Sequence, residues 1–130
     1  MIFHDAKKKV MAVGAHPDDI EFGCSGTLMR HVQAGDDVTI VVMTNSQSVD
    51  GVTGKVIRTD TQLYKETGNA ADIIGAELVV LSYTDLHIPF SFDSVSEIER
   101  YIKRDQIDTL YTHWAGDSNQ DHIAAYKASI

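Results

Sequence analysis

The segment Val10-Met11-Ala12-Val13-Gly14-Ala15-His16-Pro17-Asp18-Asp19 joins a short apolar run to a turn with an imidazole and two adjacent carboxylates. A continuous run of this kind is typical of a strand buried on both faces of a parallel sheet. Ligands of open α/β sheets bind outside the carboxyl ends of the strands. The segment therefore predicts the first strand of an α/β fold, at Lys8 to Ala15, and a polar site where that strand ends.

Outward from this segment, apolar runs alternate with stretches of helical period. Further strands are expected at Asp37 to Thr44, Glu77 to Tyr83 and Asp108 to Thr112, the first three of the four strands being buried on both faces. Helices are expected at Gly26 to Ala34, Asp60 to Ile74, around the apolar stripe Val95, Ile98 and Ile102, and at Gln120 to Ser129. This alternation predicts one doubly wound α/β domain over residues 1–130, with right-handed crossovers.

Capping signals and one long loop complete this outline. Ser94 and Glu97 match a capping box for the third helix, and Ser118 and Asp121 match one for the last. The loop Asn45 to Val56 follows the second strand, on the side of the expected site. Loops of this length are usually functional or mobile.

The composition limits the class of protein. The formal net charge of -8 disfavours nucleic acid as a partner. Cys24 is the only cysteine, so an intramolecular disulfide is impossible and a reducing compartment is expected. The apolar run near the N-terminus is too short for a signal peptide or a membrane span, and we expect a cytoplasmic location.

His16 and Asp19 are the first candidate metal ligands. Pro17 fixes the backbone of their turn, and an imidazole nitrogen and a carboxylate oxygen are both zinc ligands. The alternative is a turn in which Asp19 caps the next helix and His16 is a surface imidazole. Asp18 is the candidate general base for a metal-bound water, with an ordinary turn aspartate as its alternative.

Asp121-His122 offers a second acid–imidazole pair just after the fourth strand. In the first turn of a helix, His122 is favoured as a neutral ligand because the positive end of the helix dipole opposes its protonation. Asp121 can orient a ligand or a catalytic group, a role compatible with helix capping. We rank His113, alone at a strand end, below His16 and His122. The set His16, Asp19 and His122 suits zinc, with Fe²⁺ as an alternative.

Ala15-His16-Pro17-Asp18-Asp19-Ile20-Glu21, followed by Gly26-Thr27-Leu28, closely resembles the start of the PIG-L, or LmbE-like, N-acetylglucosaminyl deacetylase family. Residues 117–122 are similar to its second metal motif. Glu66, Ala70, Ile74 and Gly75 echo its central helix. Asp85 falls where the family usually has an acidic residue.

The resemblance implies a Rossmann-like, three-layer α/β/α fold with a mostly parallel sheet. It also implies zinc-dependent hydrolysis of an acetamido group on a small sugar-type substrate. By position, the three zinc ligands are His16, Asp19 and His122, and the base is Asp18. Asp121 then acts beside the third ligand, and Asp85 is a substrate-binding candidate.

Two departures from the family pattern stand out. Many members carry a histidine where this chain has Asn119, which we expect to bind substrate by donating a hydrogen bond to the developing oxyanion. Members also usually continue well beyond the second motif, whereas eight residues follow His122 here. We therefore expect a sheet that lacks the family's C-terminal part, with an exposed edge that favours homo-oligomers. A metal-binding but catalytically inactive fragment remains an alternative.

A signalling or nucleotide-binding α/β module is the alternative from another class. A receiver domain also has an acidic pair after its first strand, and Asp85 could serve as its phosphoacceptor. However, such a domain needs a lysine after the last strand, where this chain has His113. Gly23-Cys24-Ser25-Gly26 does not provide the glycine pattern of a dinucleotide-binding turn.

Overall fold

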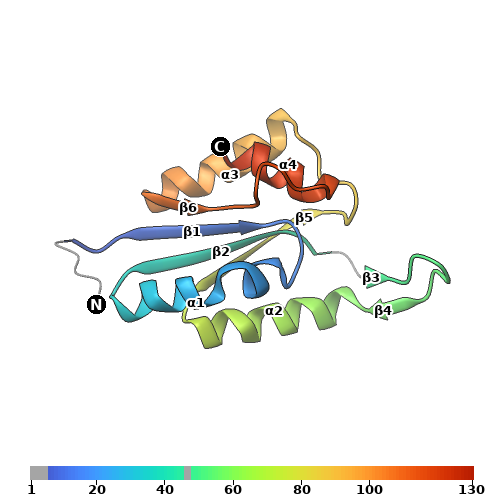
Figure 1. The fold of residues 1–130 in the computed structure, drawn as a ribbon, viewed down its shortest axis with the longest axis horizontal. Helices are drawn as coiled ribbons and strands as arrows, with labels where there is room; N and C mark the ends of the chain where they lie inside the picture. The colour runs from blue at the N-terminus through green and yellow to red at the C-terminus, as the bar shows by residue number, and fades with distance from the viewer. Residues whose placement is uncertain (1–5, 46–47) are drawn as a thin grey trace.

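Four parallel strands form the central sheet of the computed structural model, which describes residues 6–45 and 48–130. The strands are β1 (Lys9–Gly14), β2 (Asp37–Thr44), β5 (Glu77–Tyr83) and β6 (Thr109–Tyr111), in the order β5-β2-β1-β6 (Figure 1). The predicted bounds of β2 and β5 are confirmed, and those of β1 and β6 are one residue too long at each end. β1 therefore lies inside the sheet, with β2 on one side and β6 on the other.

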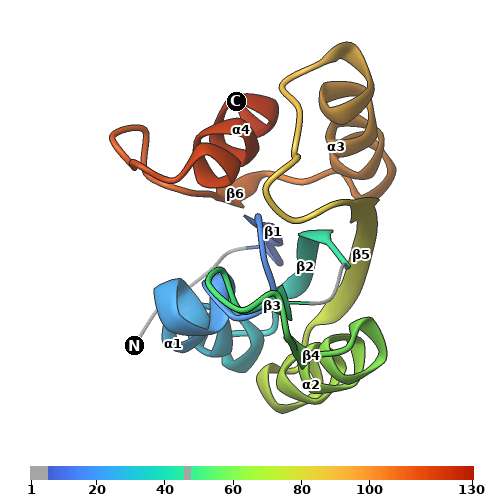
Figure 2. The same ribbon diagram turned by 90° about the vertical axis from the view of Figure 1, so that its right-hand side faces the viewer.

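Helices cover both faces of this sheet, as Figure 2 shows. α1 (Asp19–Gln33) and α2 (Asp60–Ile74) cover one face, and α3 (Phe92–Asp105) and α4 (Gln120–Ser129) cover the other. Successive strand residues point to opposite faces. Val10 accordingly packs in a core with Leu28 of α1, whereas Met11 packs in a second core with Ile98 of α3. The expected three-layer α/β/α fold is confirmed.

Burial differs between the strands. β1 and β2 are buried almost throughout, but most of β5 is only half-buried, with Glu77 and Ser82 exposed. The expectation that three strands are buried on both faces is thus wrong for β5. Among the described strands, β5 lies at an edge of the sheet and pairs with β2 alone. Among the described residues, no helix is long and apolar enough to cross a membrane.

The starts of α1 and α3 depart from the prediction, each for a local reason. α1 begins at Asp19, about two turns before the predicted Gly26, and is broken at Cys24 (φ -151°, ψ 17°). The two glycines around this break are weak helix formers, which hid the first turn. α3 begins at Phe92 because Ser91 and Ser94, rather than Ser94 and Glu97, form the capping box.

α4 has the predicted bounds but a different cap. Asn119 Oδ1 accepts hydrogen bonds from the backbone N–H groups of Asp121 (2.9 Å) and His122 (3.2 Å). The predicted box of Ser118 and Asp121 is therefore wrong. Asn is among the strongest N-cap residues, and here its cap fixes the start of the helix that carries the second motif.

The predicted loop after β2 contains a small antiparallel hairpin. Its strands are β3 (Ser48–Val49) and β4 (Val56–Arg58), and it projects beyond the carboxyl edge of the main sheet (Figure 1). These strands were too short for sequence periodicity to reveal. Part of the predicted loop, residues 46 and 47, lies outside the described residues. Thr59 then caps α2 in a capping box with Gln62.

Candidate metal centre

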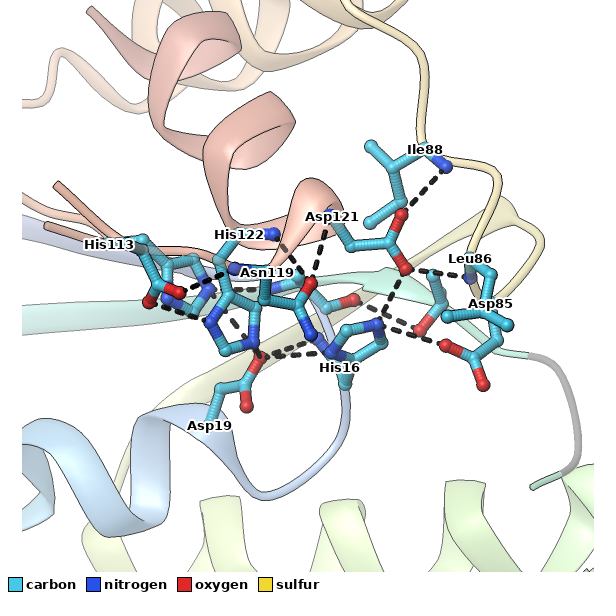
Figure 3. Close-up of polar contacts among 12 residues, drawn as sticks. His16, Asp19, Asp85, Leu86, Ile88, His113, Asn119, Asp121 and His122 are labelled. Atoms are coloured by element: carbon cyan, nitrogen blue, oxygen red, sulfur yellow. Dashed lines mark hydrogen bonds and ion pairs between the residues drawn. The ribbon is translucent and has the colours of Figure 1, made fainter. Parts of the chain in front are cut away.

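The candidate site lies where the chain connections on the two sides of β1 diverge. β1 leads into α1 on one face of the sheet, whereas β6 leads into α4 on the other. Such a topological switch point leaves a crevice outside the carboxyl strand ends. His16 follows β1, and His113 and His122 follow β6. Figure 3 shows their side chains together, beside the loop after β5.

Two carboxylates contact the same ring nitrogen of His16. Its Nε2 lies 2.7 Å from Asp121 Oδ2 and 3.0 Å from Asp85 Oδ1. Because both of these partners are acceptors, Nε2 carries a proton and donates. The other ring nitrogen, Nδ1, faces Asp19 Oδ2 at 3.4 Å.

His122 is held in the same way, through its opposite nitrogen. Its Nδ1 lies 2.9 Å from Asp117 Oδ2 and donates to that carboxylate. Its Nε2 then lies 3.2 Å from Asp19 Oδ2. A carboxylate that fixes the tautomer of a histidine in this way is a common partner of metal-binding imidazoles. The sequence placed Asp117 in the loop but gave no signal for this role.

The three predicted metal ligands converge. One nitrogen or oxygen each from His16, Asp19 and His122 lie within 4.8 Å of one another, and the two rings have centroids 5.4 Å apart. Donors bound to one tetrahedral zinc ion at about 2.0–2.2 Å lie about 3.3–3.6 Å from one another. The observed 3.4 Å and 3.2 Å separations from Asp19 are close to this range. This donor set of two imidazoles and one carboxylate therefore fits a divalent ion.

The electrostatics of the metal-free site follow from this geometry. The carboxylates of Asp19, Asp121 and Asp85 raise the pKa of His16 to about 9, because their attraction for the protonated ring exceeds the opposing effect of burial. Burial alone would raise the pKa of Asp19, but the surrounding imidazoles of His113, His16 and His122 hold it well below its ordinary value. Without a metal, the His16 ring therefore favours its protonated form, stabilised by the carboxylates around it.

Asp18, the predicted base, adopts a left-handed backbone conformation (φ 87°) at the start of α1 and makes no capping hydrogen bond there. It lines a cavity of about 440 Å³, within the size range of small-molecule sites. Partial burial of its carboxylate and the nearby charge of Asp19 raise the pKa of Asp18. The same cavity is also lined by Pro17, Glu21, Phe22, Arg58, Leu63, Glu66, Thr67 and Ala70.

Asp121, predicted to act beside the third ligand, is almost completely buried. Besides its contact with His16, it accepts hydrogen bonds from the backbone N–H groups of Leu86 (2.7 Å) and Ile88 (3.1 Å). Leu86 has a left-handed backbone conformation (φ 66°), which this anchoring stabilises. Asp121 thus links α4 to the loop after β5 and also contacts His16 Nε2.

The two predicted substrate-binding residues lie next to the candidate centre, Asp85 in the loop after β5 and Asn119 at the start of α4. Asp85 is half-buried and contacts His16 Nε2. Asn119 caps α4 with its side-chain oxygen, which leaves its amide nitrogen as the end able to donate. Substrate binding by either residue stays a prediction.

His113, ranked low from the sequence, lies in the site. Its ring stacks on His122 with centroids 4.0 Å apart and an interplanar angle of 12°. His113 also forms a second potential ligand group with Asp117 and His122, and His16 forms a third with Asp85 and Asp121. A lone histidine at a strand end gives no sequence signal of such contacts, because the conformation of the loop between His113 and His122 decides them.

Comparison with known proteins places these residues in a family context. Residues 11–130 match the family described as PIG-L, GlcNAc-PI de-N-acetylase. The chain is 36% identical over 132 residues to an "Uncharacterized deacetylase YaiS" of Escherichia coli K12, covering 95% of this chain and 67% of that protein. It is 28% identical over 107 residues to the diacetylchitobiose deacetylase of Thermococcus kodakarensis, covering 80% of this chain and 39% of that protein.

Solved structures share the fold. The N,N'-diacetylchitobiose deacetylase of Pyrococcus horikoshii superposes with a TM-score of 0.79 at 23% identity, over 94% of this chain and 48% of that one. GalB, a 4-carboxy-2-hydroxymuconate hydratase of Pseudomonas putida, gives the same TM-score at 21% identity, over 94% and 54%. The chain thus spans about half the length of these two structures. Because a hydratase has this fold too, the fold alone does not select the reaction.

Proposed function

The chain belongs to the PIG-L family, and we propose that it is a metal-dependent deacetylase that hydrolyses the acetamido group of an acetylated amino sugar or its conjugate. One observation carries this proposal: His16, Asp19 and His122 converge at metal-like distances, and Asp18 lies close enough to feel the charges of Asp19 and His16. Membership of this family argues against the signalling and dinucleotide-binding alternatives.

In this proposal the ion is held by His16 Nδ1, His122 Nε2 and the Asp19 carboxylate. A bound divalent ion such as zinc supplies a Lewis acid for the amide carbonyl and favours deprotonation of water. Asp121 and Asp117 hold the two imidazoles so that their unprotonated nitrogens face the ion. Metal-site partners of this kind commonly change metal affinity 10- to 100-fold.

Asp18 is the proposed general base. Its raised pKa suits a group that takes a proton from the attacking water and then returns it to the leaving amine. In the balanced reaction, the C–N bond breaks and water supplies the oxygen of acetate, one proton of that water goes to the amine nitrogen, and the other is taken up by the amine or by solvent. Asn119 is placed to donate a hydrogen bond from its amide nitrogen to the carbonyl oxygen as charge develops there.

The cavity beside Asp18 supports a sugar-type substrate. Arg58 and Glu66 form an ion pair in its wall (3.1 Å), and the side chain of Phe22 offers an exposed aromatic ring. Charged groups that donate and accept, next to an apolar ring, suit a polyhydroxylated ligand with one apolar face. Glu21 Oε1, buried without a hydrogen-bond partner among the described residues, adds an acceptor in the same wall.

The test couples elemental analysis of the purified chain to an acetate-release assay on N-acetylglucosamine derivatives. We expect about one divalent ion per chain and release of acetate. Asp18→Asn should keep the metal and lose at least 100-fold in kcat, the lower range for a general base. Full activity in that variant would remove Asp18 as the base.

A metal-binding but inactive form is the second candidate. It is favoured by Asn119, which stands where many members of the family carry a histidine. Stoichiometric metal without acetate release from any acetylated sugar would select this form over the deacetylase.

A further inference from the structure

A third imidazole contacts the candidate metal centre without sharing its ligand group. His113 Nε2 lies 3.5 Å from Asp19 Oδ2, and its ring stacks on the ring of His122 (Figure 3). Only 12% of the His113 side chain is exposed. The proposed function gives this residue no role, although it touches both halves of the site.

The protonation of His113 follows from a backbone contact. The N–H of Ala15 donates to His113 Nε2 at 3.0 Å. A backbone amide can only donate at its nitrogen, so Nε2 must present its lone pair and the neutral ring carries its proton on Nδ1. With that lone pair occupied, Nε2 is not available to bind a metal.

The Ala15 contact lies where the backbone ladder between β1 and β6 has ended. Ala12 and Tyr111 form the last paired positions of this ladder. Three residues beyond Ala12, the His113 ring supplies an acceptor that the β6 backbone no longer offers. A buried N–H without an acceptor is unfavourable, so this contact stabilises the approach of the first motif to the end of β6.

We propose that His113 is a positioning residue that holds the two metal motifs in register. Its Nε2 accepts the hydrogen bond of the Ala15 N–H, directly before His16. Its ring face stacks on the His122 imidazole and restricts the rotation of that ring. The proposal rests on the proposed metal centre, since its consequence is a preorganised ligand set.

Two variants separate these contacts. His113→Phe keeps a flat ring against His122 but removes the acceptor for Ala15. His113→Gln is the matched control, because its side-chain oxygen can reach the position of Nε2. Far-UV circular dichroism of both variants verifies that they are folded.

The first measurement needs no metal. Amide hydrogen exchange of Ala15 in the ¹⁵N-labelled chain should accelerate at least tenfold in His113→Phe and stay within a few-fold of wild type in His113→Gln. Equal protection of the Ala15 amide in wild type and His113→Phe would overturn the proposal, whatever the metal does.

The second measurement is titration with Co²⁺, whose visible spectrum reports coordination. We expect His113→Phe to bind Co²⁺ about 10- to 100-fold more weakly than wild type, as altered supporting contacts of a metal site do, with the spectrum unchanged at saturation. His113→Gln should bind within a few-fold of wild type.

Three outcomes divide the possibilities. Equal Co²⁺ affinity in wild type and His113→Phe would refute positioning. A changed spectrum at saturation in His113→Phe, with a loss of affinity as large as in His122→Ala, would make His113 a ligand and likewise refute it. Absence of Co²⁺ binding to the wild type would instead refute the proposed metal centre on which this inference rests.

Discussion

Two carboxylates on opposite sides of the site decide which ring nitrogens are available. Asp121 engages Nε2 of His16, whereas Asp117 engages Nδ1 of His122. The remaining nitrogens both face Asp19 Oδ2. A hydrogen bond from the Asn119 backbone and one from His122 lower the pKa of Asp117, so this partner stays ionised at neutral pH. A single change at either carboxylate would free an imidazole to turn.

The raised pKa of His16 makes the metal-free chain sensitive to pH. A group whose folded-state pKa, about 9, exceeds its ordinary value of 6.5 stabilises the fold fully below pH 6.5. That contribution is lost as pH rises through 9. We expect the free energy of unfolding of the metal-free chain to fall by about 3 kcal/mol across this window. Urea denaturation in the presence of a chelator measures it.

The control for this prediction is His16→Gln, which has no titrating group at this position. Its stability should change less than that of wild type between pH 6.5 and 9.5. Metal affinity of the wild type should rise over the same window, because protons then compete less for His16 Nδ1. Constant or increasing stability of the metal-free wild type across this window would contradict the pH account.

At the scale of elements, the bounds of β2, β5, α2 and α4 were predictable because periodicity and clear end signals agree there. The starts of α1 and α3 were not, because a break at Cys24 and a capping box at Ser91 decide them. The convergence of His16 and His122 follows from strand order once the fold is known. The contacts of His113 do not, because Ala15 lies 98 residues away along the chain.

Asn119 caps α4 and is also predicted to contact the substrate. A single substitution can separate these two roles. Asn119→Ser keeps a good N-cap oxygen but removes the amide donor. We expect thermal stability close to wild type and kcat lowered by about 10²–10³, the range for loss of one oxyanion donor. Unfolding and acetate-release assays of the same sample measure the two effects.

Asn119→Ala is the comparison variant, since it removes cap and donor together. It should lose a further 1 kcal/mol or so of stability. Wild-type kcat in Asn119→Ser would show that the residue is only a cap.

At the scale of the whole molecule, a buried polar network around Asp36 and His31 lies apart from the candidate site at the carboxyl ends of the strands. At the amino ends of the strands, buried Asp36 bonds His31 Nδ1 (2.7 Å) and the Lys8 backbone N–H (2.9 Å). His31 Nε2 in turn contacts the hydroxyl of Tyr111 at 2.9 Å. This network ties α1, the entry to β1 and β6 together without touching the metal centre.

Asp36→Ala should therefore destabilise the fold and spare the site. Removing one partner of a buried imidazole–carboxylate pair costs on the order of 3 kcal/mol. Denaturant unfolding should show this loss, while Co²⁺ affinity of the folded variant stays within a few-fold of wild type. A large loss of affinity in folded protein would mean that the two ends of the sheet are coupled.

The proposed function depends above all on the binding of one divalent ion by His16, Asp19 and His122. The most direct measurement is an anomalous-difference map from crystals of the chain grown with zinc. We expect one strong peak about 2.0–2.2 Å from His16 Nδ1, His122 Nε2 and a carboxylate oxygen of Asp19. No peak there, or a peak between Asp85 and Asp121 instead, would contradict the account.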